Sequence, residues 1–592
     1  MAVFRMSERT QTLEHFPNLV TMFLTRAGQK GDKPFLWRKS EGEWRSISWT
    51  EAARQVAALA ESLKAIGLQP GDRVMLVSEN RPEWLIADLA IMAAGCVTVP
   101  TYTTNTIRDH THVLGNSGAR AVIVSNQKLA RTLIPAVLFS SECHDVIGIE
   151  DIRTGQPSDA ARFHHWDELI GAKDNGGGDV AACAARNASI GRNQLACLIY
   201  TSGTGGAPRG VQQHHGAILH NAEGCIDIIA NDFGWDDEVF LSFLPASHAY
   251  EHSGGQHFPI ALGAQIYYAE SLEKLAANIE EVRPTIMVVV PRLFEMLRAR
   301  ILKGIEKGGL SDYLLRRALS IGAKKVKGRI PPWDLPMNAL LSATLRKKVR
   351  AKFGGRMKAM VSGGAPLNPD VGIFFDALGL PLLQGYGQTE AGPVISCNRP
   401  SVGLAMETVG PPLKNTEVRI AEDGEIMVRA ESVMHGYWRN PEETARVLID
   451  GWLATGDVGH LDKRGRIVIT DRKKDLIVND KGDNVAPQRV EGILTLQPEI
   501  AQAMVVGDRR PHLVALLVPE AEYAEREDLQ KLLSTAVDRV NADLSVVEKV
   551  RRFILADAPF TVDNEQLTPS MKIRRHVIRA AYGERLDALY KR

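Results

Sequence analysis

The stretch RVMLVSENRPEWLIADLAIMAAGCVTVPT, residues 73–101, decides the fold class. Residues 73–77 form a short apolar run typical of a buried strand, and residues 81–95 place apolar side chains at helical spacing. Residues 96–101 form a second strand-like run. Two strands joined by one helix make a βαβ unit, so this stretch predicts a parallel strand pair.

The ends of the helix in this unit carry their own signals. Asn80 followed three residues later by Glu83 resembles a capping box, and it predicts that the helix starts there. Gly95 is a glycine at the far end, where a helix commonly stops in the left-handed conformation.

The strand–helix pattern recurs along the chain. QLACLIY (194–200) leads into a glycine-rich loop and then a predicted helix, and TIMVVVP (285–291) leads into RLFEMLRARIL. MKAMVSGG (357–364) leads into NPDVGIFFDALG. Such alternation predicts an α/β fold: a large N-terminal domain of doubly wound, largely parallel sheets with helices on both faces.

The pattern changes after about residue 400. Residues 416–430 and 459–478 read as strands joined by Asp-Gly and Arg-Gly turns, which predicts hairpins and a β-rich subdomain. The last 120 or so residues, with a strand pair in 501–520 and a helix near 523–542, predict a small mobile α+β C-terminal domain. We therefore predict a large domain over 1–471 and a small one over 472–592.

The length, composition and charge of the chain limit the classes of function that it can have. The chain has 592 residues, enough for two or more domains, with 44% hydrophobic and 24% charged residues. The net charge of +1 gives no support for nucleic-acid binding. The six cysteines are scattered without metal-ligand spacing, which indicates buried thiols in a reducing compartment. The N-terminus lacks the apolar core of a secretory signal, so we expect a cytoplasmic protein.

One segment is strongly basic. Residues 303–358 contain 15 Lys and Arg residues against Glu306, Asp312 and Asp334. The simplest interpretation is a set of solvated helices. The alternative is a surface for anionic lipid or for a phosphorylated cosubstrate, with peripheral attachment to the inner face of a membrane.

The loop YTSGTGGAPRGV, residues 200–211, has the composition of a phosphate-binding loop. It is not the common NTPase loop, because no Lys-Ser/Thr pair follows its glycines. Hydroxyls, glycines whose backbone N–H groups can turn toward one anion, and one cation are all present. They are Thr201, Ser202 and Thr204; Gly203, Gly205 and Gly206; and Arg209.

Six further motifs follow this loop in a fixed order: LPASHAYEHSGG (244–255), SGGAPLN (362–368), QGYGQTEAG (384–392), GWLATGDVG (451–459), DRKKDLIV (471–478) and LTPSMKIRR (567–575). Together the seven resemble the signature set of the adenylate-forming superfamily. The resemblance runs from residue 47 to Lys572. LPASHAYE and the LTPSMKIRR ending are most similar to long-chain fatty acyl-CoA synthetases.

The resemblance implies a two-step reaction that needs ATP, Mg²⁺ and CoA. A fatty acid carboxylate attacks the α-phosphate, giving acyl-AMP and pyrophosphate, and the CoA thiol then displaces AMP. Because two anions must meet, such a site needs cations and oriented donors at the α-phosphate.

The same resemblance implies roles for individual residues. Glu390 corresponds to the Mg²⁺ ligand with the Thr201 hydroxyl as second contact, and Thr389 to the hydroxyl at the α-phosphate. Tyr386 corresponds to the ring that stacks on adenine, and Asp457 to the acceptor of the ribose hydroxyls. The remaining nucleotide-binding positions are Ser202, Gly203, Thr204, Arg209, Gly364, Ala365, Pro366, Gln384, Gly385 and Arg472.

The resemblance implies roles for three further residues in the two half-reactions. Lys572 corresponds to the lysine that bridges the attacking carboxylate and the α-phosphate, a task suited to a compact charge on a flexible stem. Lys474 matches the hinge about which the C-terminal domain rotates between the two half-reactions. After that rotation the loop 481–487 is implied to replace Lys572. His248 sits where the acyl substrate approaches, and either a substrate-steadying or a structural role is open.

The sequence departs from the family pattern at two loop positions. Gly205 stands where the usual loop has a second Thr, and Arg209 stands where it has Lys. These changes bear on ATP affinity more than on the reaction. Asp483 adds an acidic residue near the expected path of the anionic cosubstrate.

Two alternatives to a fatty acid:CoA ligase stay open. One is a fatty acyl-AMP ligase that loads a carrier protein, a group that typically carries an insertion not obvious in this chain. The other is a catalytically silent nucleotide- or lipid-binding homologue, supported only by the altered loop. Acyl chain length and oligomeric state are not reported by any motif.

Overall fold

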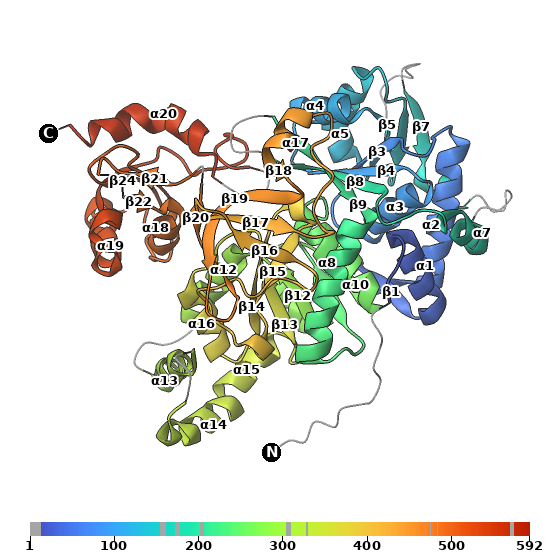
Figure 1. Ribbon diagram of the computed structural model, residues 1–592. Helices are drawn as coiled ribbons and strands as arrows, with labels where there is room; N and C mark the ends of the chain where they lie inside the picture. Colours follow the sequence, from blue (N-terminus) through green and yellow to red (C-terminus); the bar gives the residue numbers. More distant parts are fainter. Residues whose placement is uncertain are drawn as a thin grey trace.

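The computed structural model describes residues 14–153, 161–171, 178–201, 207–303, 309–326, 330–473, 475–481, 483–568 and 573–591. Two large, mostly parallel sheets and a smaller antiparallel sheet form the N-terminal part, and the C-terminal part lies beside them with its own sheet (Figure 1). The α/β prediction with a β-rich subdomain and a separate C-terminal domain is confirmed.

The first large sheet has seven strands in the order β7-β6-β5-β3-β4-β8-β9. It is parallel throughout except for the antiparallel pair β8–β9. Its strands are β3 (Arg73–Val77), β4 (Val97–Thr101), β5 (Ala119–Val124), β6 (Asp145–Gly148), β7 (Arg162–His165), β8 (Leu195–Thr201) and β9 (Arg209–His214). The connecting helices are α3 (Pro82–Ala93), α4 (Ile107–Ser117), α5 (Gln127–Leu138), α6 (Trp166–Gly171) and α7 (Val180–Asn187).

The βαβ unit of residues 73–101 is therefore present, with β3 and β4 parallel. The capping-box prediction is wrong, because Arg81 is the N-cap residue of α3 and makes no side-chain cap bond. Asn80 instead donates to the Leu244 carbonyl at 2.6 Å and accepts from the Ala246 N–H at 2.9 Å. Gly95 ends the helix region at φ +79°, as predicted.

The second large sheet has eight strands in the order β15-β14-β13-β12-β10-β11-β1-β2, parallel between β14 and β1 and antiparallel at both edges. The strands are β1 (Pro34–Ser40), β2 (Glu43–Ser48), β10 (Val239–Ser242), β11 (Gln265–Tyr268), β12 (Ile286–Val289), β13 (Ala359–Ser362), β14 (Leu382–Gly387) and β15 (Val394–Cys397). The helices around it are α1 (Leu19–Lys30), α2 (Trp49–Ala65), α8 (His215–Ile228), α9 (Ala249–Glu251), α10 (Phe258–Leu262), α11 (Leu275–Val282), α12 (Pro291–Lys303), α13 (Leu310–Val326), α14 (Leu335–Ala343), α15 (Leu345–Lys352) and α16 (Pro369–Ala377).

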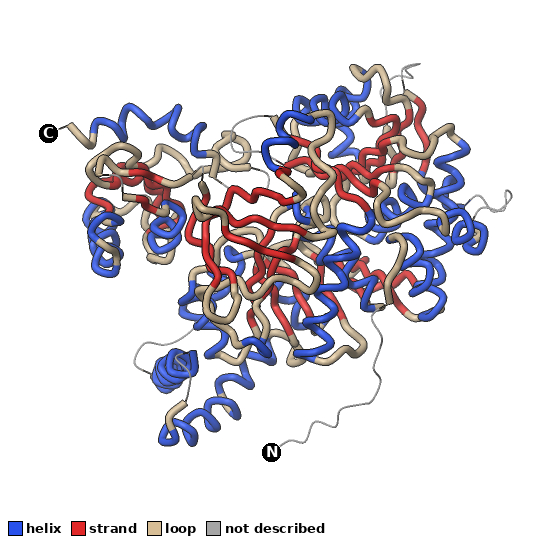
Figure 2. The backbone as a smooth tube through the Cα atoms, in the orientation of Figure 1, coloured by secondary structure: helices blue, strands red, loops and turns tan. Residues whose placement is uncertain are grey.

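One apolar core joins the two large sheets. Side chains of α1, α2, α3, α8 and α10 pack between them, together with residues such as Leu76 of β3 and Ile266 of β11. Separate clusters cover the outer faces, with α4 and α5 on one sheet and α11, α13 and α16 on the other. The result is alternating helix and sheet layers, which Figure 2 shows by colour. Helices therefore cover both faces of each large sheet, as is usual for parallel sheets.

The third sheet is antiparallel and carries the predicted hairpins. Its strands are β16 (Glu417–Ile420), β17 (Glu425–Arg429), β18 (Leu448–Ile449), β19 (Trp452–Leu461) and β20 (Ile467–Arg472), with helix α17 (Pro441–Val447) beside them. Gly424 and Gly465 turn the two hairpins at positive φ. Short 3-10 turns η5 (Thr389–Ala391) and η6 (Pro400–Val402) precede this sheet.

The C-terminal part contains β21 (Ile477–Val478), β22 (Asn484–Val485), β23 (Ile500–Val506), β24 (Leu513–Pro519) and β25 (Val550–Leu555), with helices α18 (Pro487–Leu494), α19 (Leu529–Asp543) and α20 (Arg575–Ala588) and the 3-10 turn η7 (Val546–Glu548). Apolar clusters lie on both faces of its three-stranded sheet. The helix predicted near 523–542 begins only at Leu529, because residues 521–525 form turns.

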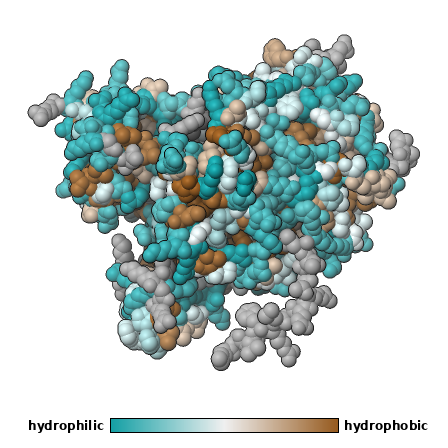
Figure 3. Space-filling view, in the orientation of Figure 1, coloured by the Kyte–Doolittle hydropathy of each residue, from teal (hydrophilic) through white to brown (hydrophobic). Residues whose placement is uncertain are grey.

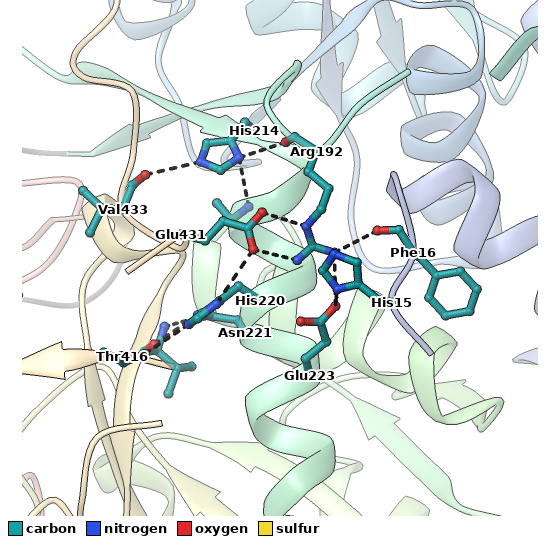
Figure 4. Close-up of polar contacts among 12 residues, drawn as sticks. His15, Phe16, Arg192, His214, His220, Asn221, Glu223, Thr416, Glu431 and Val433 are labelled. Carbon is teal, nitrogen blue, oxygen red and sulfur yellow. Dashed lines mark hydrogen bonds and ion pairs between the residues drawn. The ribbon is translucent and has the colours of Figure 1, made fainter. Parts of the chain in front are cut away.

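An ion-pair network connects segments of the N-terminal region that are far apart in the sequence (Figure 4). The Arg192 guanidinium contacts Glu431 in the segment after β17 at 2.6 and 2.8 Å and Glu223 of α8 at 3.1 Å. It also donates to the Phe16 carbonyl at 2.8 Å. A Cβ at Gly216 would lie 2.5 Å from the Glu431 carboxylate, so a larger residue there would require this carboxylate to shift.

Two π-helical turns, η2 (Ile229–Phe233) and η3 (His252–His257), lie next to the site described below. His252 and His257 of η3 both hydrogen-bond through Nε2 to Asp88 Oδ2, at 3.1 and 3.0 Å, and all three side chains are fully buried. These contacts fix η3 against α3. The six cysteines are free thiols, and five of them are buried, as expected.

Replacing Glu251, the last residue of α9 and directly before η3, tests how the stability of the protein depends on pH. Glu251 accepts from Ser242 Oγ at 2.6 Å, and burial raises the pKa of its carboxyl to about 8. A carboxyl whose pKa is higher in the folded protein than in the unfolded chain destabilises the fold as pH rises from the unfolded pKa to the folded pKa. By pH 7 this lowers the free energy of unfolding by roughly 3 kcal/mol. We expect Glu251→Gln to gain thermal stability over wild type as pH rises from 5 to 8.5. Thermal unfolding with Glu43→Gln on exposed β2 as control measures this, and a pH-independent difference would contradict it.

Candidate active site

A cavity of about 870 Å³ lies where the second and third sheets approach each other, with contributions from β8 and β9. Most of the residues expected for the nucleotide and metal line it. They are Thr201, Arg209, His248, Gly364, Gly385, Tyr386, Thr389, Glu390, Asp457 and Arg472. Residues spread over more than 270 positions of the chain thus meet in one space, as parallel sheets with functional loops at strand ends allow.

Three expected residues are not among the described residues that line this cavity. Ala365 and Pro366 are exposed beyond Gly364, and Gln384 is buried within β14. Their nucleotide contacts therefore stay predictions. Five others, Ser202, Gly203, Thr204, Lys474 and Lys572, lie outside the described residues, as do Gly205, Gly206 and Gly482.

The glycine-rich loop joins two antiparallel strands. β8 pairs with β9, and Thr201 stands opposite Arg209 in their register. The prediction that a helix follows the loop directly is wrong, because α8 begins at His215 after β9 has ended. Among the described residues, the element that follows the loop is β9, and Arg209 at its start places a fixed positive charge beside the loop.

The nucleoside end of the cavity is built on the hairpin β19–β20. Asp457 and Arg472 are cross-strand partners, and Arg472 Nε donates to Asp457 Oδ1 at 3.2 Å. Tyr386 Oη donates to Asp457 Oδ2 at 2.7 Å. Burial next to Asp457 raises the pKa of Tyr386, so the phenol keeps its proton and remains a donor. Each carboxylate oxygen retains acceptor capacity, which fits a ribose diol.

The metal end is built on η5. Glu390 is half-buried, and Tyr437 Oη donates to its Oε1 at 2.8 Å. A Cβ at Gly387 would lie 1.8 Å from the Pro393 carbonyl oxygen, so only glycine allows the chain to bend into this turn. A carboxylate from Glu390 and a hydroxyl from Thr201, both at the cavity wall, are the oxygen ligands that Mg²⁺ prefers, so the donor set fits the ion.

The acyl end is apolar. Tyr250 Oη donates to the Val361 carbonyl at 2.8 Å, and a Cβ at Gly363 would come within 2.8 Å of the Tyr250 ring. His248 caps α9, with its Nδ1 accepting from the Tyr250 N–H at 3.2 Å. Beyond these residues the cavity wall consists of side chains that suit an aliphatic chain: Cys225, Ile228, Ile229, Phe258, Ile286 and Leu383.

Several lining residues were not anticipated from the sequence. Tyr437, Glu443 and Arg446 contribute to the wall, as do Glu425 and Lys473. The first three lie in or just after GYWRNPEET (436–444), where Asn440-Pro441 signals a helix start. That signal predicts a helix but gives no indication that its charged residues face a cavity.

The C-terminal part reaches the cavity through Asp475. Asp483, in the loop implied to serve the second half-reaction, accepts from the Asn479 side chain at 2.9 Å. Its carboxylate therefore has a local structural partner in this arrangement.

Comparisons with family models and with known proteins show which family the chain belongs to. Residues 23–438 match the model of AMP-binding enzymes, and residues 474–592 match that of the AMP-binding enzyme C-terminal domain. The chain is 32% identical to long-chain-fatty-acid–CoA ligase FadD15 of Mycobacterium tuberculosis, over 98% of each chain. It is 28% identical to the chloroplastic long-chain-fatty-acid–[acyl-carrier-protein] ligase AEE15 of Arabidopsis thaliana, over 92% of this chain and 82% of that one.

Among solved structures, the adenylation domain of a carboxylate reductase from Mycobacterium chelonae is similar in fold. The TM-score is 0.76 at 22% identity, with 98% of this chain and 92% of that chain covered. The family model covers well over half of the sequence, and the relative from M. tuberculosis covers nearly all of it. The chain therefore belongs to the AMP-binding enzyme family.

Proposed function

We propose that the protein is an ATP- and Mg²⁺-dependent ligase that joins a long-chain fatty acid to CoA through an acyl-AMP intermediate. The observation that carries this is the continuity of one cavity from the Asp457–Tyr386 pair, past Glu390, to the apolar wall around Ile228 and Phe258. A nucleotide and an aliphatic acid bound at these two ends would meet near Thr389.

In the first step, each of the residues at the cavity has a separate role. Asp457 holds the ribose, and Tyr386 borders the base, so the α-phosphate is fixed near Thr389. Glu390 and Thr201 would hold Mg²⁺, and the ion would supply positive charge that offsets the negative charge of the phosphates. Lys572 brings a further cation to the attacking carboxylate. The new acyl C(=O)–O–P bond forms as the bond to pyrophosphate breaks.

In the second step the CoA thiolate attacks the acyl carbon, the bond between that carbon and the phosphate oxygen breaks, and AMP leaves with this oxygen. We assign the adenylation machinery to residues 1–471 and the rotating part to 472–592, with the hinge at Lys474 and loop 481–487 serving the second step. His248 steadies the substrate from its place as the cap of α9.

A carrier-protein ligase is the second candidate, since AEE15 is among the relatives. The deciding assay measures pyrophosphate release and thioester formation with Mg-ATP and saturated acids of increasing length, with and without CoA. A CoA thioester of long acids supports the proposal. Acyl-AMP without thioester supports carrier loading, and no product from any acid supports a silent homologue.

We further propose that the protein is cytoplasmic and attaches peripherally to anionic membranes through 303–358. The α13–α14 region projects from the body, with apolar and hydrophilic side chains side by side (Figures 1 and 3). Trp333 and Leu310 are 76% and 74% exposed, and α15 exposes a basic row. Part of the charge is compensated internally, for example by Asp334. No helix among the described residues is long and apolar enough to cross a membrane.

Flotation with phosphatidylglycerol-containing vesicles tests this attachment. We expect wild type to float at low salt, and the double variant Leu310→Ser, Trp333→Ser to lose about tenfold or more in partitioning, because each side chain contributes roughly 1.5–3 kcal/mol on burial. Phe139→Ser, which removes an exposed apolar residue elsewhere, serves as control. Equal flotation of the double variant and the control would refute the attachment surface.

A further inference from the structure

Arg209, at the position where a lysine is usual, is already engaged on two sides. Its Nη1 donates to Glu443 Oε2 at 2.8 Å, across 234 residues of sequence. Its guanidinium carbon lies 4.3 Å from the centre of the Tyr437 ring. Both Arg209 and Glu443 line the cavity, and their side chains are 26% and 27% exposed. The cation is therefore held in a defined place at the wall.

Glu443 is itself held by the start of α17. Its backbone N–H donates to the Asn440 side chain at 3.2 Å, and its other carboxylate oxygen pairs with Arg446. Arg446 also lines the cavity. One carboxylate thus bridges two guanidinium groups at the end of the cavity where the glycine-rich loop begins.

The contacts continue to the candidate metal ligand. Tyr437, which lies under the Arg209 guanidinium, donates through its hydroxyl to Glu390 Oε1 at 2.8 Å. Glu443, Arg209, Tyr437 and Glu390 therefore form one series of direct contacts. A shift of Arg209 would therefore alter, through Tyr437, the hydrogen bond to the Glu390 carboxylate, which is proposed to hold Mg²⁺.

Glu443 contacts Arg209 through one hydrogen bond from Nη1, and the N–H that donates to this carboxylate cannot donate to a phosphate at the same time. A polyphosphate arriving at this wall meets a cation whose charge Glu443 has already offset. The polyphosphate must displace the Glu443 carboxylate, or bind despite the repulsion between the two negative charges. The pair is partly exposed, so the exchange costs little enough to occur during a catalytic cycle.

We propose that Glu443 is a positioning residue that holds Arg209 in the free enzyme and yields it to the polyphosphate of ATP, and that the return of Glu443 favours release of pyrophosphate. This rests on the proposed use of ATP. In this proposal Arg209 is one cation for which the Glu443 carboxylate and the polyphosphate compete.

Calorimetric titration of the full-length protein with Mg-ATP, and separately with Mg-pyrophosphate, tests this exchange. Glu443→Gln keeps the size of the side chain and removes the competing charge. We expect it to bind both ligands about three- to tenfold more tightly. The matched control is Glu442→Gln, because Glu442 pairs with Arg446 on the same helix but is not among the residues lining the cavity.

Two further measurements separate competition from a merely structural role. In an Arg209→Gln background, Glu443→Gln should no longer tighten binding, since the shared cation is gone. In steady-state assays Glu443→Gln should lower KM for ATP, whereas loss of a structural contact would lower kcat and the melting temperature instead.

The outcomes distinguish this inference from the proposed function. If wild type binds Mg-ATP and Glu443→Gln binds both ligands equally or more weakly, the inference is overturned and the ligase proposal stands. Tightening that persists in the Arg209→Gln background overturns it as well. If neither protein binds Mg-ATP or Mg-pyrophosphate, both the inference and the proposed function are overturned.

Discussion

Replacing Lys572 by alanine is expected to reduce acyl-adenylate formation by about 10²–10³-fold, the scale of losing one charged group that stabilises the reacting oxygens. The alanine variant keeps the metal and nucleotide residues, so Mg-ATP should still bind. Pyrophosphate release in the presence of a fatty acid measures the loss.

The two half-reactions respond differently to this change. Because loop 481–487 is proposed to take the place of Lys572 in the second step, thioester formation from preformed acyl-AMP and CoA should remain within a few-fold of wild type. Arg574→Ala, which removes a neighbouring cation, is the control. Normal adenylation in the Lys572 variant, or equal loss in both steps, would refute the assigned role.

Replacing Glu390 by glutamine is expected to lower adenylation by a similar factor of about 10²–10³. The amide oxygen can still accept from Tyr437 Oη, so the local fold is preserved while the negative charge is lost. Mg²⁺ prefers charged oxygen ligands, and the concentration of Mg²⁺ needed for half-maximal rate should rise.

A Mg²⁺ titration of the adenylation rate at saturating ATP separates this effect from misfolding. Glu422→Gln, on the turn between β16 and β17, provides a control with the same chemical change on an exposed loop. If the Glu390 variant keeps the wild-type Mg²⁺ dependence, Glu390 does not hold the metal.

Local signals predicted most of the architecture. The strand runs at 73–77 and 96–101 and the helix between them fold as expected, because continuous apolar runs and a terminal glycine act within a few residues. The hairpins around Gly424 and Gly465 form for the same reason. Predictions failed where a polar side chain found a distant partner, as Asn80 did with the loop after β10.

The loop at 200–211 shows the same limit. Its composition indicates phosphate binding, but the strand β9 between the loop and α8 is not predicted, because RGVQQH has no pattern that separates a strand from a helix. Gln384 lies in a recognisable motif, and only the structure shows that it is buried within β14 and is not among the described residues that line the cavity.

The sequence by itself determined the order of the motifs, the α/β class and the residue types at the nucleotide end, since these depend on local spacing and side-chain chemistry. Only the tertiary structure decided which residues share the cavity. Arg209 and Glu443 are 234 positions apart, and the pairing of a cation with a carboxylate across that separation depends on how β9 and α17 pack. No periodicity in the chain reports such a contact, because its energy arises only after the two elements have been brought together.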